Sequence, residues 1–345
     1  MIIELQALSN ISLTAKDPFQ KQHCLYIQVT MENVSAVTSF ILTAYTELED
    51  HRYLYFICFL LLYIMIIVAN AVLITVIYIE RGLHEPMYLF ICSLAVNGVF
   101  GSTSLLPSML VFLLSHSYEI SLTHCLLQIY CLYSYAHGEF TILAVMSYDR
   151  YVAICHPLHY HLLMSPKKLY AAITLSWVIP FIYFALIFIM TVQLTFCVRI
   201  IEKVYCANFP LVKLSCFDTN VQNILALAST FVSPISQILM ILFSYGQIFR
   251  ICLFASKESQ TKAIRTCTPH LLTLINFSVG CLFEAIQSRF NMSHVPHKAR
   301  IFLSLHMFLF PPLLNPVIYG ISNQAIKVHI FKLFSSKKKS EPHSR

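Results

Sequence analysis

Seven long apolar stretches limit what this chain can fold into more than any other feature. They cover residues 54–78, 88–114, 123–150, 169–193, 222–250, 264–285 and 300–320. A helix needs roughly 20 mostly apolar residues to cross a bilayer, and in lipid only a helix or a closed barrel satisfies its own backbone. A barrel would need alternating segments of about ten residues, which the sequence lacks. The sequence therefore predicts an all-α membrane protein, a bundle of seven transmembrane helices.

Composition agrees with this prediction. Of the 345 residues, 57% are hydrophobic and 11% are charged. In a soluble domain about half of the residues are apolar and about a quarter are charged. The net charge of +7 arises mostly from Lys and Arg on one side of the predicted membrane. We therefore expect no nucleic-acid partner.

The distribution of Lys and Arg between loops predicts the orientation, because cytoplasmic loops carry an excess of them. The side that holds the C-terminal tail carries fourteen, and the other side carries nine. The tail is therefore expected in the cytoplasm and the N-terminus outside. Three Asn-X-Ser sequons then fall outside, and we expect glycosylation at Asn33 and also at Asn10 and Asn291.

Apart from Cys24 in the N-terminal segment, four of the twelve cysteines fall on the outer side, namely Cys125, Cys197, Cys206 and Cys216. A long outer loop with three cysteines favours disulfides, and four cysteines allow three pairings. A zinc site is the alternative, but the spacing lacks the short Cys-X-X-Cys pattern. We expect no metal and no cofactor.

The foot of the third apolar stretch carries an adjacent acid and base, Asp149 and Arg150. Arg150 could simply be an interface anchor whose charge reaches water. However, Glu139 lies eleven residues earlier, about 20° from three full helical turns and ~16 Å deeper. Ionisable residues at that depth normally face the bundle interior and mark function. The pattern predicts a buried polar seam, which also includes Asn70 and Asn97 on the first two stretches.

Residues 146–160, MSYDRYVAICHPLHY, resemble the third-span foot of rhodopsin-like G protein-coupled receptors, and in particular of olfactory receptors. Further stretches of this kind follow in family order on the predicted spans. They are HEPMY at 84–88, KAIRTCTPH at 262–270 and PPLLNPVIY at 311–319. The resemblance runs from about residue 33 to 334.

This resemblance implies two disulfides, Cys125–Cys206 and Cys197–Cys216. It also implies that Asp149 restrains Arg150 in the inactive receptor, and that activation releases the arginine toward Tyr245 and Tyr319. The residues expected to couple to a G protein or to switch on activation are Asp149, Arg150, Tyr151, Tyr245, His270, Asn315, Pro316 and Tyr319.

The ligand site is expected among the third, fifth, sixth and seventh spans. Helical spacing and matching family positions predict as its residues Tyr133, Ala136, His137, Ser229, Ser233, Ser278, Cys281, Ala285 and Leu305. An apolar wall with a few hydroxyls suits a small, mostly apolar ligand. Leu132 occupies the position where amine receptors hold a carboxylate, so an amine ligand is not expected.

The chain also departs from the family pattern. Gly98 replaces the usual second-span Asp, with Asn97 beside it, and Ser278 follows Phe277 where many relatives have Tyr. These departures indicate a divergent branch. The expected divisions are an extracellular segment at 1–53 (with 1–30 a possible extended leader), the receptor domain at 54–321 and a cytoplasmic segment at 322–345. The last should form a short amphipathic eighth helix and a basic tail that contacts membrane lipid.

The resemblance thus implies a plasma-membrane odorant receptor that activates a stimulatory G protein and raises cAMP. A receptor for another small non-amine ligand is the nearest alternative. A secondary transporter is the alternative from a different class, but transporters usually show internal repeats with helices broken by Gly or Pro, which the sequence lacks. No nucleophile–base motif suggests an enzyme.

Overall fold

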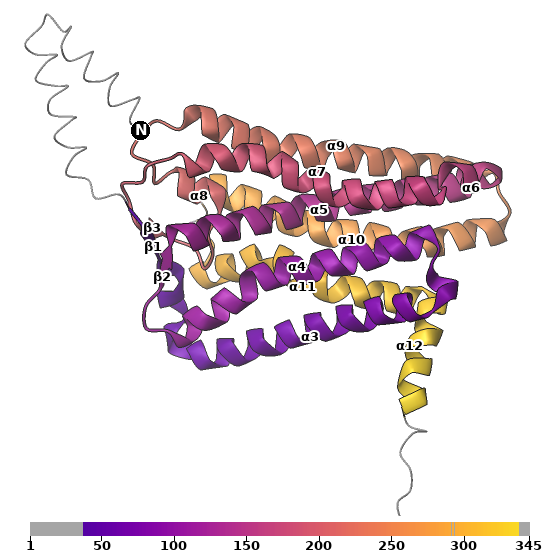
Figure 1. Cartoon of the computed structure of the whole chain (residues 1–345), viewed down its shortest axis with the longest axis horizontal. Coiled ribbons are helices and arrows are strands. Elements are labelled where there is room, and N and C mark those ends of the chain that lie inside the picture. The colour runs from indigo at the N-terminus through magenta and orange to yellow at the C-terminus, as the bar shows by residue number, and fades with distance from the viewer. Residues whose placement is uncertain (1–36, 291, 293, 338–345) are drawn as a thin grey trace, which may run out of the picture.

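The computed structural model describes residues 37–290, 292 and 294–337 (Figure 1). The predicted leader and the three predicted glycosylation sites at Asn10, Asn33 and Asn291 lie outside these residues.

In the described chain, seven long helices run side by side (Figure 1). They are α3 (Arg52–Ile79), α4 (Pro86–Leu114), α5 (Leu122–Cys155), α7 (Pro166–Val192), α9 (Asn220–Leu253), α10 (Lys257–Arg289) and α11 (His297–Ser322). Each predicted apolar stretch falls on one of these helices, although the helices extend beyond it by as many as seven residues, as at the start of α10. The molecule is predominantly helical, as predicted.

Local sequence signals explain where several helices begin. Pro86 and Pro166 are the first residues of α4 and α7, a position where the missing N–H has no helical partner anyway. The hydroxyl of Ser121 accepts a hydrogen bond from the backbone N–H of His124 at the start of α5. Ser256 caps α10 in the same way, so both helices begin with a satisfied donor.

Six of these helices are long and apolar enough to cross a membrane, among the described residues. The exception is α5, which carries Glu139, Asp149 and Arg150. It packs against α4, α7, α9 and α10, and its ionisable side chains at 139 and 149 are fully buried. The protein therefore places a long helix with two buried acids in the middle of the bundle.

A small β-sheet joins the helix ends on one side of the bundle, so the chain is not purely α-helical. Strand β1 (Ser39–Leu42) pairs antiparallel with β2 (Glu119–Ser121) and parallel with β3 (Ile200–Ile201). All three strands are short and lie next to helix ends or in loops, where apolar periodicity gives no signal. They form because the outer loop is drawn across the bundle, and its free backbone groups then find partners in the segment before α3.

Short helices fill the remaining connections. In the described residues they are η1 (Thr43–His51), η2 (Arg81–Leu83), η3 (Pro157–His159), α6 (Tyr160–Leu163) and α8 (Asn208–Val212). After α11 the chain turns at Asn323, whose side-chain oxygen accepts from the backbone N–H groups of Ala325 and Ile326. This cap starts α12 (Gln324–Lys337), which leaves the bundle at an angle (Figure 1) and buries Ile326 completely.

Candidate functional site

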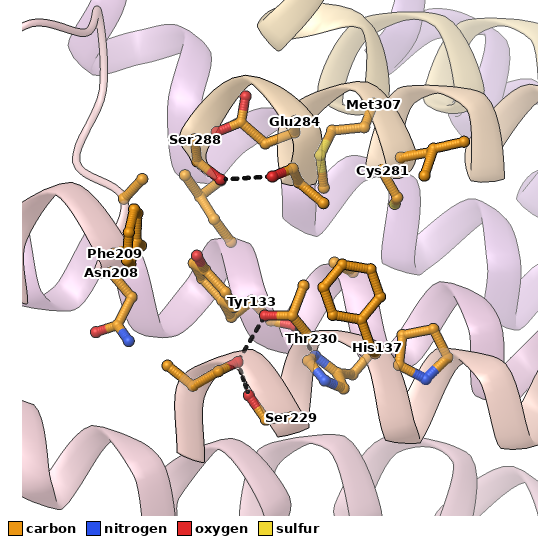
Figure 2. A pocket seen from close by; sticks show the side chains of 18 of the residues that line it. Tyr133, His137, Asn208, Phe209, Ser229, Thr230, Cys281, Glu284, Ser288 and Met307 are labelled. Carbon is orange, nitrogen blue, oxygen red and sulfur yellow. Dashed lines mark hydrogen bonds between the residues drawn. The ribbon is translucent and has the colours of Figure 1, made fainter. Parts of the chain in front are cut away.

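A cavity of about 470 Å³ lies between α5, α9, α10 and α11, toward the end of the bundle that carries the sheet (Figure 2). Its wall is mostly apolar, with a few hydroxyl groups. Seven of the nine predicted ligand-site residues line it, namely Tyr133, Ala136, His137, Ser229, Ser278, Cys281 and Ala285. The volume suits a small molecule rather than a peptide.

Two predicted ligand-site residues, Ser233 and Leu305, do not line the cavity. At the level of Ser233 the α9 wall is formed by Pro234, Ile235 and Ile238, and each residue turns the helix by about 100°. Ser233 therefore faces away from them. Leu305 is fully buried in helix packing, and Met307 and Phe308 are the α11 residues that reach the cavity.

The outer side of the cavity is closed by the loop between α7 and α9, which the sequence reasoning did not assign to the ligand site. Tyr205, Asn208 and Phe209 of this loop line the cavity. The loop is held down by the Cys125–Cys206 disulfide, and the backbone N–H of Cys206 donates to the Gln128 side chain at 2.9 Å. Because Cys206 is bonded to the first turn of α5, its neighbours in the loop lie over the bundle. The disulfide was therefore the sequence feature from which these loop residues of the ligand site could have been predicted.

The second disulfide, Cys197–Cys216, closes a loop of its own, with a sequence separation of 19 residues. The two disulfides occur in the pairs that the family resemblance implies. The first spans 81 residues and joins the loop to the bundle, whereas the second shapes only the loop.

Charged side chains pair at the outer rim of the cavity. Lys203 of the loop forms an ion pair with Glu284 of α10, and both side chains are largely buried. The Arg289 guanidinium lies 3.5 Å from the centre of the Phe209 ring, an arrangement that a cation and an aromatic face favour. Glu284 thus already has a cationic partner from the protein.

Midway along α5, Glu139 is completely buried and each of its two oxygens accepts one hydrogen bond. The donors are the side-chain amides of Asn97 and Asn315, both at 2.8 Å. Asn70 is also buried, but it donates to the carbonyl oxygens of Ile66 and Pro312 instead. The buried polar residues thus bind α5 to α4 and α11, and α3 to α11.

The glycine that replaces the family's usual Asp has a close neighbour. A Cβ atom at Gly98 would lie 3.3 Å from Pro312 of α11, which is tighter than ordinary van der Waals contact. A side chain at this position would require Pro312 to shift by a few tenths of an ångström. Asn97, one residue earlier, supplies the polar contact to Glu139 instead.

At the opposite end of α5, Asp149 forms an ion pair with Arg150. The same carboxylate accepts a hydrogen bond from the Tyr160 hydroxyl at 2.8 Å. Burial, followed by the nearby Asp149 charge, raises the pKa of Tyr160 well above its usual range, so the phenol remains a donor. Tyr160 ends the motif at 146–160, but the sequence reasoning gave it no role.

Other predicted switch residues lie on the helices around this cluster of Asp149, Arg150 and Tyr160. The Tyr319 hydroxyl and the His270 ring nitrogen are 3.2 Å apart, which joins α11 to α10. The Tyr245 hydroxyl of α9 is buried without a hydrogen-bond partner. Tyr151 instead bonds His156 at 3.0 Å, and Pro316 is buried on α11.

No group of three or more His, Cys, Asp or Glu side chains that could hold a metal ion occurs in the described part of the chain.

These features define a class of protein. Long apolar helices surround a buried, ligand-sized cavity near one end, and a paired acid and base sit at the other end of the central helix. This is the arrangement of a multi-pass membrane receptor.

The family is shown by comparison with known proteins. The olfactory receptor family model matches residues 58–337, and the chain belongs to the olfactory receptor family of G protein-coupled receptors. Its members are plasma-membrane receptors rather than enzymes.

Individual relatives agree over nearly the whole chain. Human olfactory receptor 2AT4 is 32% identical over 313 residues, which cover 88% of this chain and 95% of the relative. Mouse olfactory receptor 5AP2 is 34% identical, with coverage of 88% and 95%. Human olfactory receptor 52Z1P is 35% identical, with coverage of 80% and 93%.

Proposed function

We propose that this receptor binds a small, mostly apolar odorant in the cavity between α5, α9, α10 and α11, and responds by activating a stimulatory heterotrimeric G protein that raises cAMP. The observation that carries the proposal is the cavity itself, whose wall combines apolar side chains with a few polar atoms. Family membership supports the coupling to a G protein.

In this proposal α5 also spans the membrane, as the third of seven spanning helices in chain order. Its polar side chains are shielded from lipid by the neighbouring helices. The N-terminal segment lies outside the cell, and the chain from residue 322 onward lies in the cytoplasm. Helix α12 rests on the inner leaflet as the eighth helix: Ile326 packs on the bundle, whereas Phe331 is exposed and enters the lipid beside Lys327 and Lys332. The basic tail beyond it attracts anionic lipid.

The switch is the cluster of Asp149, Arg150 and Tyr160. In the resting receptor Arg150 is bound to Asp149, and activation releases it toward α9 and α11. Tyr245 supports this role, because its buried hydroxyl has no partner in the present arrangement. A ligand favours the active state only by binding it more tightly than the resting state.

The test is a panel of odorants applied to cells that express the receptor with a cAMP reporter. We expect at least one small apolar compound to raise cAMP in a concentration-dependent way, with no response in cells that lack the receptor. Uptake of the same compounds into receptor-containing vesicles, without any cAMP response, would instead identify a transporter.

A further inference from the structure

One ring nitrogen in the cavity wall has no hydrogen-bond partner. His137 of α5 lines the cavity and is 6% exposed. Its Nδ1 lies 2.9 Å from the backbone carbonyl oxygen of Tyr133. A carbonyl oxygen can only accept, so Nδ1 carries the proton. In the neutral imidazole, Nε2 is then an acceptor without a proton of its own. It is buried, the backbone of Ser229 lies near the ring, and no donor reaches Nε2 with hydrogen-bond geometry.

The facing wall on α9 also offers the cavity acceptors rather than hydrogen-bond donors. The hydroxyls of Ser229 and Thr230 both donate to the backbone carbonyl of Ala226, each at 2.8 Å. Figure 2 shows these two side chains beside His137. Because their hydrogens are already used within the helix, they present only lone pairs to the cavity.

A proline adds a further acceptor at the same place. Pro234 lies inside α9 and lines the cavity, and it has no N–H group to donate. It therefore leaves the carbonyl of Thr230, four residues earlier, without its usual helical donor. The wall shared by α5 and α9 thus gathers acceptors from His137, Ser229 and Thr230.

We propose that this wall selects ligands with a hydrogen-bond donor, that is, apolar alcohols and phenols, whose O–H bonds to Nε2 of His137. The inference rests on the proposed function and adds the chemical class of the odorant. An ether or ketone with the same carbon skeleton offers only lone pairs to this wall, so it leaves the buried acceptors unpaired. His137 is then a specificity-determining residue.

The geometry holds the ring in position for this bond. The Nδ1 contact fixes the ring on its own helix turn, and the Tyr183 ring of α7 packs 5.2 Å from it, centre to centre. One turn below, Thr141 donates to the His137 carbonyl, and Gln237 of α9 donates to Thr141 at 2.8 Å. A ligand bound at His137 therefore contacts a chain of hydrogen bonds that joins α5 to α9.

The experiment compares octanol, menthol and thymol, each with its own methyl ether, in the cAMP assay. A response to any of them tests the proposed function, whereas the ratio between alcohol and ether tests this inference. We expect each active alcohol to be at least about tenfold more potent than its ether, since a site built to bond a hydroxyl rejects analogues that lack it. Ethers as potent as the alcohols would overturn the inference.

Two variants and one control locate the effect. His137→Phe keeps an aromatic ring but removes the acceptor, so it should bring the alcohol potency down to that of the ether. Thr230→Val replaces an acceptor hydroxyl with a methyl group of similar size, and it should lower the ratio between alcohol and ether potency less than His137→Phe does. His306→Phe is the matched control, because His306 stacks on Phe310 away from the cavity, and it should leave the ratio unchanged. If His137→Phe weakens alcohol and ether equally, the histidine is only structural.

Discussion

The two ends of α5 are held in different ways. The end beside the sheet is fixed by the disulfide between Cys125 and Cys206, beneath a loop that also forms a strand of that sheet. The opposite end is held by one ion pair and one phenol hydrogen bond, at Asp149. A covalent tie keeps the cavity in one shape, whereas the ionic contact can break and reform. In the proposed function, ligand shape is read at the rigid end and movement occurs at the other.

The largest effect is expected from removing the covalent tie. Cys125→Ser should abolish surface expression, since loss of a native disulfide typically costs about 2–5 kcal/mol. Cys197→Ser should lower surface expression less, because its disulfide closes only a short loop. Flow cytometry of an N-terminally tagged receptor measures both. Equal losses of surface expression for the two variants would contradict the claim that the Cys125–Cys206 disulfide matters more than the Cys197–Cys216 disulfide.

Removing the arginine at the other end should leave folding intact but stop signalling. Arg150→Ala is expected at the surface in near-normal amounts, because the carboxylate of Asp149 keeps its bond from Tyr160. Agonist-driven cAMP should fall to background. Arg81→Ala, at an exposed arginine between α3 and α4, is the control and should signal normally. A wild-type response from Arg150→Ala would contradict the switch.

Between the two ends, Glu139 allows a graded test. Glu139→Ala leaves the amides of Asn97 and Asn315 buried without their acceptor, at about 1–3 kcal/mol each, so surface expression and signalling should both fall strongly. Glu139→Gln keeps the shape. The NH₂ group of the new glutamine can donate a hydrogen bond to Oδ1 of Asn315, which has no partner in the wild type. This requires the Asn315 amide to flip by 180°.

We therefore expect the Gln variant to retain most of its expression and much of its signalling. Melting temperatures of the purified receptors would rank wild type, Gln and Ala in that order. Glutamine and alanine variants that melt together would show that the negative charge of Glu139, rather than its hydrogen bonds, holds the helices.

The smallest effect is expected at Tyr160. Tyr160→Phe removes one hydrogen bond from Asp149, worth ~1 kcal/mol, which corresponds to about a fivefold shift between two states. Ligand-independent cAMP should rise modestly, with unchanged surface expression. Tyr170→Phe, on the exposed face of α7, is the control. Unchanged basal cAMP would confine the restraint to the ion pair with Arg150.

The helices were predictable from the sequence because lipid leaves the backbone few choices. The seven apolar stretches coincide with helices, and helical spacing placed Tyr133, Ala136 and His137 on the cavity wall. The partners of Glu139 were not predictable in detail, because which amide reaches a buried carboxylate depends on how three helices pack. Asn97 and Asn315 do so, whereas Asn70 bonds backbone carbonyls.

The sheet and the loop over the cavity could not be predicted from the sequence, for a different reason. Residues 39–42 and 200–201 pair only because the chain brings two distant segments together, and no local pattern encodes that contact. Tyr205 and Phe209 reach the ligand site from the same loop. Only the disulfide pairing, which the family resemblance implied, indicated that this loop lies over the bundle.

The hydrogen bonds of Glu139 also have a consequence for how the receptor is made. During translation, Asn97 has already been synthesised 42 residues before Glu139, whereas Asn315 follows 176 residues later. At about 5–20 residues per second, the carboxylate waits roughly 10–35 seconds for its second partner. Throughout that time α5 is in or near the membrane with a half-paired acid. The nascent chain is therefore most exposed to quality control before α11 emerges.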